Sequence, residues 1–478
     1  MGMKDSPMWG TIACGAGLFS DGYLNAIIGP VGTMLKHIYG TAYSNSPSYA
    51  NVSALVFVGT VVGQLVFGYT SDHISRKWSL MVSTVILIIF AIMGAGAYGA
   101  HGSLDGMLAA LCAYRFLLGI GIGGEYPAGS VGASEHSGSL KAGSRNRMFI
   151  MFTNVQIDLG FVVAPLVAMI VTLACTENHL RAAWRICLGL GALPPISLFY
   201  LRLKISEPEP YKHEKMTAKQ TPWLLTFRYY GPRLCIVAVI WFIYDFSAYS
   251  FGIYSSAILD GLLGGSSKLW VSFGWSTLLN LFYMPGAIAG GYLSDTRLGA
   301  KKTLIICLIL QAIVGFIMAA CYTSLSKHIG GFVVVYGLFL ALGECGPGDN
   351  IGLFAAKTSS THVRGKYYGL AAAFGKIGAF VGNYAFPAIG KYAHGDELKS
   401  GQYQFYTGAA LAIFAAFLGL LLPELDQDVV AREDIEFREY LESHGYDTSV
   451  LGIHDGSEAS LEASETQQVK AESHNKFD

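Results

Sequence analysis

The sequence has few charged residues for its length. Only 14% of its 478 residues are Asp, Glu, Lys or Arg, whereas 52% are hydrophobic, and the mean hydropathy is +0.43. The formal net charge of −1 says nothing useful about partners, and we expect no nucleic-acid partner. Because apolar runs repeatedly exceed 18 residues, the chain is predicted to be an all-α protein that crosses the lipid bilayer several times.

The sequence also lacks the residue patterns of a metal centre or a catalytic site. Its eight cysteines show no CxxC spacing and no pairing with histidine, so we expect neither a metal nor a disulfide framework. No nucleophile–base constellation appears, and we expect neither a cofactor nor an enzyme. The first apolar run is followed by no small-residue cleavage site, which predicts a retained first helix.

Twelve membrane spans are predicted from the apolar runs. They lie at 9–35, 51–70, 79–99, 105–133, 147–173, 183–201, 233–259, 270–293, 303–323, 330–355, 366–390 and 404–422. Lysine and arginine are more frequent in the loops after the second, fourth, sixth, eighth and tenth spans than in the alternate loops. Positive charge marks the cytoplasmic side, so both termini are predicted to be cytoplasmic.

An internal repeat divides the spans into two groups of six. The segment GYTSDHISRKW at 68–78 recurs as GYLSDTRLGAKK at 291–302. The repeat predicts an N-terminal half (1–201), a polar cytoplasmic linker (202–232), a C-terminal half (233–422) and a partly disordered cytoplasmic tail (423–478). Residues 431–444 of that tail are predicted to form an amphipathic helix. Two repeated halves are typical of alternating-access transporters, whose binding site lies between them.

The segment 111–135 places Arg115 and Glu125 inside a predicted span. Ten helical residues separate them, so they lie about 15 Å apart along the helix axis. Ionisable groups at such depth usually face a bundle interior or a water-filled cavity. Two interpretations stay open here: a structural ion pair that joins two helices, and a pathway for a solute and protons.

Further polar residues occur in the other spans. They include Asp21, Asn25, Tyr126, Asn154, Gln156, Asp158, Trp241, Tyr244, Asp245, Tyr249, Glu344, Asp349, Asn350 and Lys376. Trp241, Asp245 and Tyr249 follow i, i+4, i+8 spacing and share one helix face. Some of these residues, such as Asn154, are equally well explained as contacts between helices. Desolvation favours the neutral form of a carboxyl group, so several buried carboxyls can exchange protons.

Lys376 stands alone among apolar and glycine residues of the eleventh span. It is expected either to neutralise a carboxylate or to receive an anion. Asp21, Glu125 and Asp245 could supply its counter-charge in the empty protein, so the two roles can alternate.

The loops that carry the repeat are predicted to form a cytoplasmic gate. The expected gate residues are Asp72, Arg76, Arg145, Asp295 and Arg364, with Lys301 beside Asp295. Charge pairs there would hold the two halves together in one state and separate in the other. The alternative is that these are ordinary solvated loop residues.

These motifs resemble those of the major facilitator superfamily over essentially all twelve spans. GYTSDHISRK and its repeat resemble that superfamily's loop signature, SEPEP at 206–210 looks like a sugar-porter motif, and VRG at 363–365 is similar to its loop between spans ten and eleven. GIGIGGEYP followed by SVGASE resembles the phosphate:proton symporter signature, with Glu125 in place of aspartate. GLFSDGYLN, GECGPGDNIGL, KTSSTHVRGKYYG and LPELDQD resemble fungal permeases for glycerophosphoinositol and glycerophosphocholine.

The resemblance implies roles for particular residues. Asp21, Glu125 and Asp245 would carry or relay protons, with Arg115 paired to Asp21. Lys376 and Tyr126 would hold the phosphate, and Trp241, Tyr249 and Asn350 would line the head-group side, with Asn25 and Asn154 also contacting substrate. Leu24 replaces a second aspartate of the phosphate symporters, and Gly348 replaces an asparagine, which would leave room for a larger head group.

The expected function is therefore a monomeric proton symporter that imports glycerophosphodiesters across the plasma membrane. Its partners would be a small organophosphate, protons and the lipid bilayer. Two alternatives remain: an inorganic phosphate:proton symporter, and a transporter-like receptor that signals through its tail.

Overall fold

The computed structural model describes residues 7–448 apart from 139, 142, 205–210, 212–220, 264–267, 394–395 and 427. Within this part of the chain the structure is helical and contains no strand. SEPEP at 206–210, most of the predicted linker and residues 449–478 of the tail lie outside the described residues. Eight described helices are long and apolar enough to cross a membrane, and the full helix set fits a twelve-helix membrane fold.

Among the first six passages, the second and third are single helices, whereas the other four are divided into several helices where the chain bends. They are α1 (Pro7–Gly15), α2 (Leu18–Ala26) and α3 (Ile28–Tyr39); α5 (Ser48–His73); α6 (Arg76–Ala95); α7 (Leu104–Gly124), η3 (Glu125–Ser130) and α8 (Val131–Ser137); α9 (Arg145–Phe152) and α10 (Asn154–Cys175); and α11 (Leu180–Leu190) and α12 (Leu193–Arg202). The short helix α4 (Thr41–Ser44) joins the first passage to the second.

The second six passages follow the same plan. They are α14 (Trp223–Leu262); α15 (Leu269–Leu281) and α16 (Tyr283–Ser294); α17 (Gly299–Ala320); α19 (Ile329–Gly343), η5 (Glu344–Gly348) and α20 (Asp349–Lys357); α21 (Arg364–Tyr392); and α22 (Glu397–Gly419). Helix α14 begins within the segment that was predicted to be linker. The short helix α18 (Tyr322–Leu325) follows α17.

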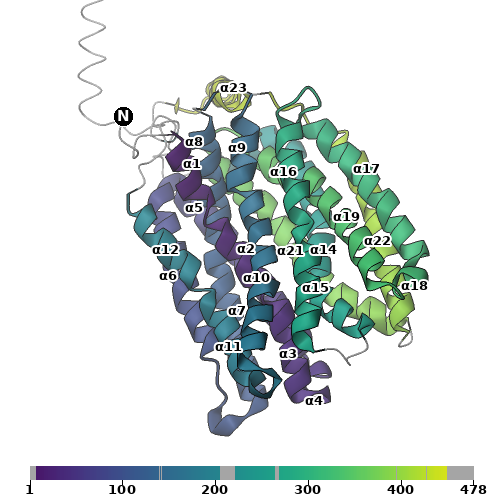
Figure 1. Ribbon diagram of the computed structural model, residues 1–478. Coiled ribbons are helices and arrows are strands. Elements are labelled where there is room, and N and C mark those ends of the chain that lie inside the picture. The colour runs from purple at the N-terminus through teal and green to yellow at the C-terminus, as the bar shows by residue number, and fades with distance from the viewer. Residues whose placement is uncertain are drawn as a thin grey trace, which may run out of the picture.

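The two halves stand side by side, and a last helix lies across one end (Figure 1). This helix, α23 (Val429–Ser443), confirms the helix predicted at 431–444. Helices α1 and α23 lie at the same end of the molecule, here named the α23 end, and α4 and α18 lie at the opposite end (Figure 1). The spans and their division into two halves were therefore predicted from the sequence.

Both halves contain a π-helical turn in their fourth passage. In η3 and in η5 the turn begins with a glutamate, Glu125 or Glu344, and contains a proline, Pro127 or Pro347. Proline has no backbone N–H and cannot continue the ordinary helical hydrogen-bond pattern. Such turns widen a helix and are frequent at functional sites. The repeat thus places a glutamate at a deformed turn near the middle of each half.

A buried ion pair ties η3 to the sixth passage. The Arg202 guanidinium contacts both carboxylate oxygens of Glu125 at 2.5 and 2.7 Å, and the Ser83 hydroxyl donates to the same carboxylate at 3.0 Å. Both charged side chains are almost fully buried. Gly17 makes space for the pair, since a Cβ there would lie 1.9 Å from an Arg202 nitrogen. The structural ion pair considered for the fourth span exists, but its cation is Arg202.

Close backbone contact joins the halves along α5 and α21. A Cβ added to Gly369 would lie 2.5 Å from the Gln64 carbonyl oxygen, and one added to Gly68 would lie 2.9 Å from the Gly365 carbonyl oxygen. Helices approach this closely in membranes only where small residues meet. The seal between the halves therefore depends on glycine at these positions.

We predict that Gly369→Val opens the α23 end. Overpacking a close contact costs about 1–3 kcal/mol, and separating α5 from α21 relieves it. A cysteine introduced at Ser130, in a chain whose exposed Cys235 and Cys321 are replaced by serine, should then react faster with a maleimide added from the α23 side. Gly94→Val is the control, because a Cβ at Gly94 would meet nothing within 4 Å. Equal labelling rates in the two variants would show that the contact between α5 and α21 does not close the α23 end.

We also predict that Arg202→Met destabilises the protein more than the double variant Glu125→Gln/Arg202→Met. Removing one partner of a buried pair leaves an uncompensated charge and costs about 3–5 kcal/mol, whereas removing both charges does not. Melting temperatures of the purified proteins test the order, with the exposed Lys204→Met as the control. A double variant that melts no higher than Arg202→Met would show that the two side chains are not coupled.

Candidate functional site

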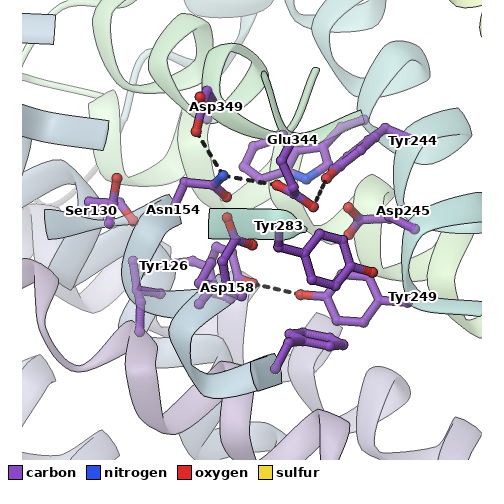
Figure 2. Close-up of a pocket in the computed structure, with 18 of the residues that line it drawn as sticks. Tyr126, Ser130, Asn154, Asp158, Tyr244, Asp245, Tyr249, Tyr283, Glu344 and Asp349 are labelled. Carbon is purple, nitrogen blue, oxygen red and sulfur yellow. Dashed lines mark hydrogen bonds between the residues drawn. The ribbon is translucent and has the colours of Figure 1, made fainter. Parts of the chain in front are cut away.

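A small cavity lies between the two halves, with about 60 Å³ of space that water-sized molecules can occupy. Its wall is formed by Leu18, Tyr126, Ser130, Phe149, Thr153, Asn154, Ile157, Asp158, Phe161, Trp241, Tyr244, Asp245, Ala248, Tyr249, Tyr283, Glu344, Gly348, Asp349, Gly352, Tyr368 and Lys376. Both π-helical turns contribute residues to it. Figure 2 draws 18 of these residues and labels ten, with polar groups from both halves around one space. The predicted residues Tyr126, Asn154, Trp241, Asp245, Tyr249 and Lys376 all line it.

Lys376 is the one lysine or arginine among the described residues that line this cavity. Its ammonium group contacts Asp245 Oδ2 at 3.0 Å and the Tyr249 hydroxyl at 2.5 Å. It also lies 4.8 Å from the centre of the Tyr126 ring. An ammonium group has three N–H donors, so one donor is left beyond these two bonds. Lys376 is thus paired with one of the carboxylates that were expected to neutralise it.

A chain of hydrogen bonds leads from this lysine into the N-terminal half. The hydroxyls of Tyr249 and Tyr126 lie 3.2 Å apart, and Tyr126 donates to Asp21 Oδ2. Asn25 donates to the other oxygen of Asp21. Asp21 and Asn25 are fully buried behind Tyr126 and do not line the cavity. Asn25, which was expected to contact substrate, therefore lies outside the cavity in this conformation and holds the Asp21 carboxyl in place.

Three further carboxyl groups form a second polar centre in the cavity. Asn154 donates to Glu344 Oε2 and Asp349 Oδ1, both at 2.9 Å, and Tyr244 donates to Glu344 Oε1. Asp158 lies close enough to Glu344 and Asp349 for their charges to interact. We name Asp158, Glu344 and Asp349 the acidic cluster. Asp158 and Asp349 each have one buried carboxylate oxygen without a hydrogen-bond partner.

Two predicted positions are corrected by the structure. Arg115 does not pair with Asp21, because its guanidinium donates to the carbonyl oxygens of Leu24 at 2.6 Å and Val52 at 3.2 Å. Its third nitrogen, Nη2, has no partner. Within the described chain Arg115 therefore bonds to backbone where α2, α5 and α7 meet and forms no ion pair.

Asn350 also lies outside the cavity. It donates to the Gly346 carbonyl at 2.8 Å and accepts a hydrogen bond from Ser294 at 2.7 Å. It therefore fastens η5 to α16. The space expected beside Gly348 is occupied, since a Cβ there would lie 2.1 Å from Glu344 Oε2. Glycine at this position admits the Glu344 carboxylate.

At the α23 end, Asp72 of the N-terminal half caps a helix of the other half. Its oxygens accept from the backbone N–H groups of Gly365 and Lys366, each at 2.9 Å, in the first turn of α21. Arg76 and the Lys366 ammonium group contact the same carboxylate at 2.9 and 3.3 Å. The first N–H groups of a helix lack internal partners and attract negative charge. This contact seals α5 against α21.

Asp295 of the C-terminal half makes the reciprocal contact. It accepts from the backbone N–H groups of Asn146 at 3.2 Å and Arg147 at 2.8 Å, in the first turn of α9. Lys301, which was expected to pair with Asp295, lies 3.9 Å from Glu424. Each copy of the repeated motif therefore places its aspartate at the start of a helix in the opposite half.

The remaining gate residues join these contacts to α23. Glu135 lies between Arg76 at 2.7 Å and Arg364 at 3.4 Å, and so links the halves. On α23 and just before it, Asp434 lies 3.6 Å from Arg364 and Asp428 lies 2.6 Å from Arg145. All five predicted gate residues thus contribute to contacts that close the α23 end.

The opposite end of the cavity also has contacts between the halves. His37 of α3 lies 3.1 Å from Asp260 of α14, and Glu177 accepts from the Leu269 backbone N–H at 2.8 Å. A Cβ at Gly29 would lie 2.3 Å from the Ile253 carbonyl oxygen. The two halves are therefore in contact on both sides of the cavity, at the α23 end and at the opposite end.

Several important residues were not chosen from the sequence. Four of them were noted as polar residues in the spans but given no individual role: Asp158, Tyr244, Glu344 and Asp349. Arg202 was placed at the start of the predicted linker. The signal that could have identified Asp158 is its spacing from Asn154, since residues four apart share a helix face. Glu344 could have been found from its position at a proline-containing turn that mirrors Glu125.

Comparisons with known proteins give the family. A model of the sugar (and other) transporter family matches residues 9–215 and 208–428. The chain is 48% identical to the glycerophosphocholine permease GIT4 of Candida albicans over 93% of this chain and 84% of that protein. It is 47% identical to the major glycerophosphoinositol permease GIT3 of the same organism, over 94% and 85%.

A more distant relative and the solved structures agree with this result. The glycerophosphoinositol transporter 1 of Saccharomyces cerevisiae is 32% identical over 94% of this chain and 85% of its own length. The fold matches the proton:xylose symporter XylE with a TM-score of 0.76 at 15% identity, over 90% of this chain and 99% of that chain. The chain belongs to the sugar (and other) transporter family of the major facilitator superfamily.

Proposed function

We propose that this protein is a proton symporter that imports glycerophosphodiesters across the plasma membrane by alternating access. The relatives named above support the substrate class, since they are permeases for glycerophosphocholine and glycerophosphoinositol. Each covers more than nine-tenths of this chain. The α23 end is proposed to be cytoplasmic, in agreement with the lysine and arginine of its loops. We also propose that the chain is divided into an N-terminal half that ends at residue 201, a linker at 202–232, a C-terminal half at 233–422 and a tail from residue 423. The protein is proposed to act as a monomer.

The observation that carries the proposal is Lys376. It is a buried cation at a cavity between the halves, and its ammonium group lies 3.0 Å from Asp245. A phosphodiester that enters the cavity offers the same charge as that carboxylate. We propose that the phosphate takes the Asp245 position beside Lys376 and Tyr126, and that Asp245 accepts a proton when it is displaced.

Proton movement is proposed to involve the carboxyl groups on either side of the lysine. Asp21 is connected to Tyr249 through Tyr126, so a change at Lys376 reaches it through two hydroxyls. Glu125 would take up a proton as it separates from Arg202. Substrate and proton would then leave together after the Asp72 and Asp295 contacts at the α23 end open.

We expect proteoliposomes that contain this protein to accumulate labelled glycerophosphocholine and glycerophosphoinositol when an inward proton gradient is imposed. A protonophore should abolish accumulation, because the gradient is its energy source. Liposomes without protein are the control. Uptake of inorganic phosphate in place of both diesters would overturn the substrate class and favour a phosphate symporter. Absence of all three fluxes would overturn the assignment as a transporter.

Lys376→Gln should abolish uptake of both diesters, because it removes the cation that meets the phosphate they share. Binding of each diester to the purified variant, measured by calorimetry, should be lost as well. The control is Lys327→Gln, which changes an exposed lysine after α18. If the Lys376→Gln variant binds both diesters normally, Lys376 does not bind their phosphate group.

A further inference from the structure

The acidic cluster is not explained by the phosphate or by the gate. Asp158, Glu344 and Asp349 are at least 94% buried, with relative exposures of 2, 6 and 1%. In the part of the chain that the structure describes, none of the three forms an ion pair with lysine or arginine. A buried carboxyl group without a counter-ion favours its neutral form, and a cation placed beside it would stabilise the charged form. A cationic ligand in the cavity would supply the ion pair that the described residues do not provide.

Comparison of the two halves shows that Glu344 has no counter-ion equivalent to Arg202 among the described residues. Glu125 and Glu344 begin the two π-helical turns of the fourth and tenth passages. Glu125 is neutralised by Arg202 at the end of the sixth passage. Glu344 instead receives hydrogen bonds from two neutral groups, Tyr244 and Asn154. The N-terminal half thus has its own counter-ion, whereas the C-terminal half presents its glutamate to the cavity.

The unpartnered oxygen of Asp158 is the one that suggests a ligand with positive charge, because Asp349 Oδ2 packs against Gly290 of α16, where a Cβ would lie 2.1 Å from it. Oδ2 of Asp158 and Oδ2 of Asp349 are buried and accept no hydrogen bond. Asp158 lines the cavity, and Figure 2 shows its carboxyl group among the polar side chains around the open space. Asn154 and Tyr244 donate to both oxygens of Glu344 and to one oxygen of Asp349, so these two carboxyl groups are held in place before a ligand arrives.

Aromatic rings form the wall beside the cluster. Phe161 follows Asp158 by three residues on α10 and therefore lies on the same helix face. Its ring packs edge-on against Tyr249 and Tyr283, with both pairs of ring centres 5.8 Å apart. Carboxylates combined with aromatic rings are the environment that binds quaternary ammonium groups, which have no N–H to donate and are held by charge and by ring faces. A polyol could form hydrogen bonds with the cluster but could not stabilise its charged form.

We propose that the acidic cluster and its aromatic wall form a subsite for a quaternary ammonium head group, so that the cavity holds a zwitterionic diester with its phosphate at Lys376 and its ammonium at Asp158, Glu344 and Asp349. This inference rests on the proposed function and adds the head-group contact to it. It assigns selectivity for glycerophosphocholine over glycerophosphoinositol to residues of α10, η5 and α20.

The test compares uptake of the two diesters by the same variants. Asp158→Asn keeps the size of the side chain and removes its charge. Its ratio of glycerophosphocholine to glycerophosphoinositol uptake should fall about tenfold or more, the scale expected when one desolvated charge contact is lost. Glu344→Gln should act in the same direction. Asp105→Asn, an exposed residue of α7, is the matched control and should keep the wild-type ratio.

A second measurement separates charge from shape. Tetramethylammonium should inhibit glycerophosphocholine uptake by the wild type and should inhibit the Asp158→Asn variant much less. Tyr283→Leu should lower glycerophosphocholine uptake more than glycerophosphoinositol uptake, whereas Tyr283→Phe should restore it, because the aromatic face is retained.

The outcomes distinguish this inference from the proposed function. If Asp158→Asn and Glu344→Gln lower uptake of both diesters equally, the cluster serves proton coupling and the head-group subsite is wrong. An unchanged ratio in both variants overturns it as well. If wild-type protein transports neither diester, the proposed function itself fails. Surface expression of every variant is measured in the same cells, so a folding defect is recognised separately.

Discussion

The dominant physical constraint on this structure is the cost of placing a charge inside a low-dielectric helix bundle. The structure meets it in three ways. Glu125 and Arg202 form a closed pair within one half. Lys376 and Asp245 form a buried pair in the cavity wall, and we propose that a phosphate replaces Asp245 there. The acidic cluster forms no ion pair with lysine or arginine among the described residues, and we propose that a cationic ligand stabilises its charged form.

The internal repeat shows how one plan produced different functions in the two halves. The gate has kept the symmetry, because Asp72 and Asp295 each cap a helix of the opposite half. The fourth passages have kept the π-helical turn and its glutamate but not the counter-ion. Lys376 comes from the second half alone. Symmetric contacts suit a motion in which the halves separate at one end and then the other, whereas a site for an asymmetric solute needs different groups on its two sides.

The sequence was sufficient to predict the fold because each span is a local property of about twenty residues. It also predicted that Asp245 and Tyr249 share a face, since their spacing is one helical turn. It could not show which helices meet. Arg202 follows an apolar run and was therefore counted with the loop, yet α12 carries its side chain to Glu125. Asn350 was expected in the cavity beside Asp349, but neighbouring residues on a helix point in different directions, and Asn350 faces α16. The convergence of Asp158, Glu344 and Asp349 depends on packing between α10, η5 and α20, which no spacing along the chain records.

The head group that we propose for the acidic cluster would also decide the net charge that is transported. A diester with a quaternary ammonium is neutral overall, so a cycle that carries it with one proton moves one positive charge into the cell. A diester with a polyol head group carries one negative charge, and the same cycle moves no net charge. Each elementary charge moved across 100 mV changes the free energy by about 2.3 kcal/mol. With a fixed proton stoichiometry, the membrane potential would therefore drive accumulation of the first kind of diester and leave the second to the pH difference alone.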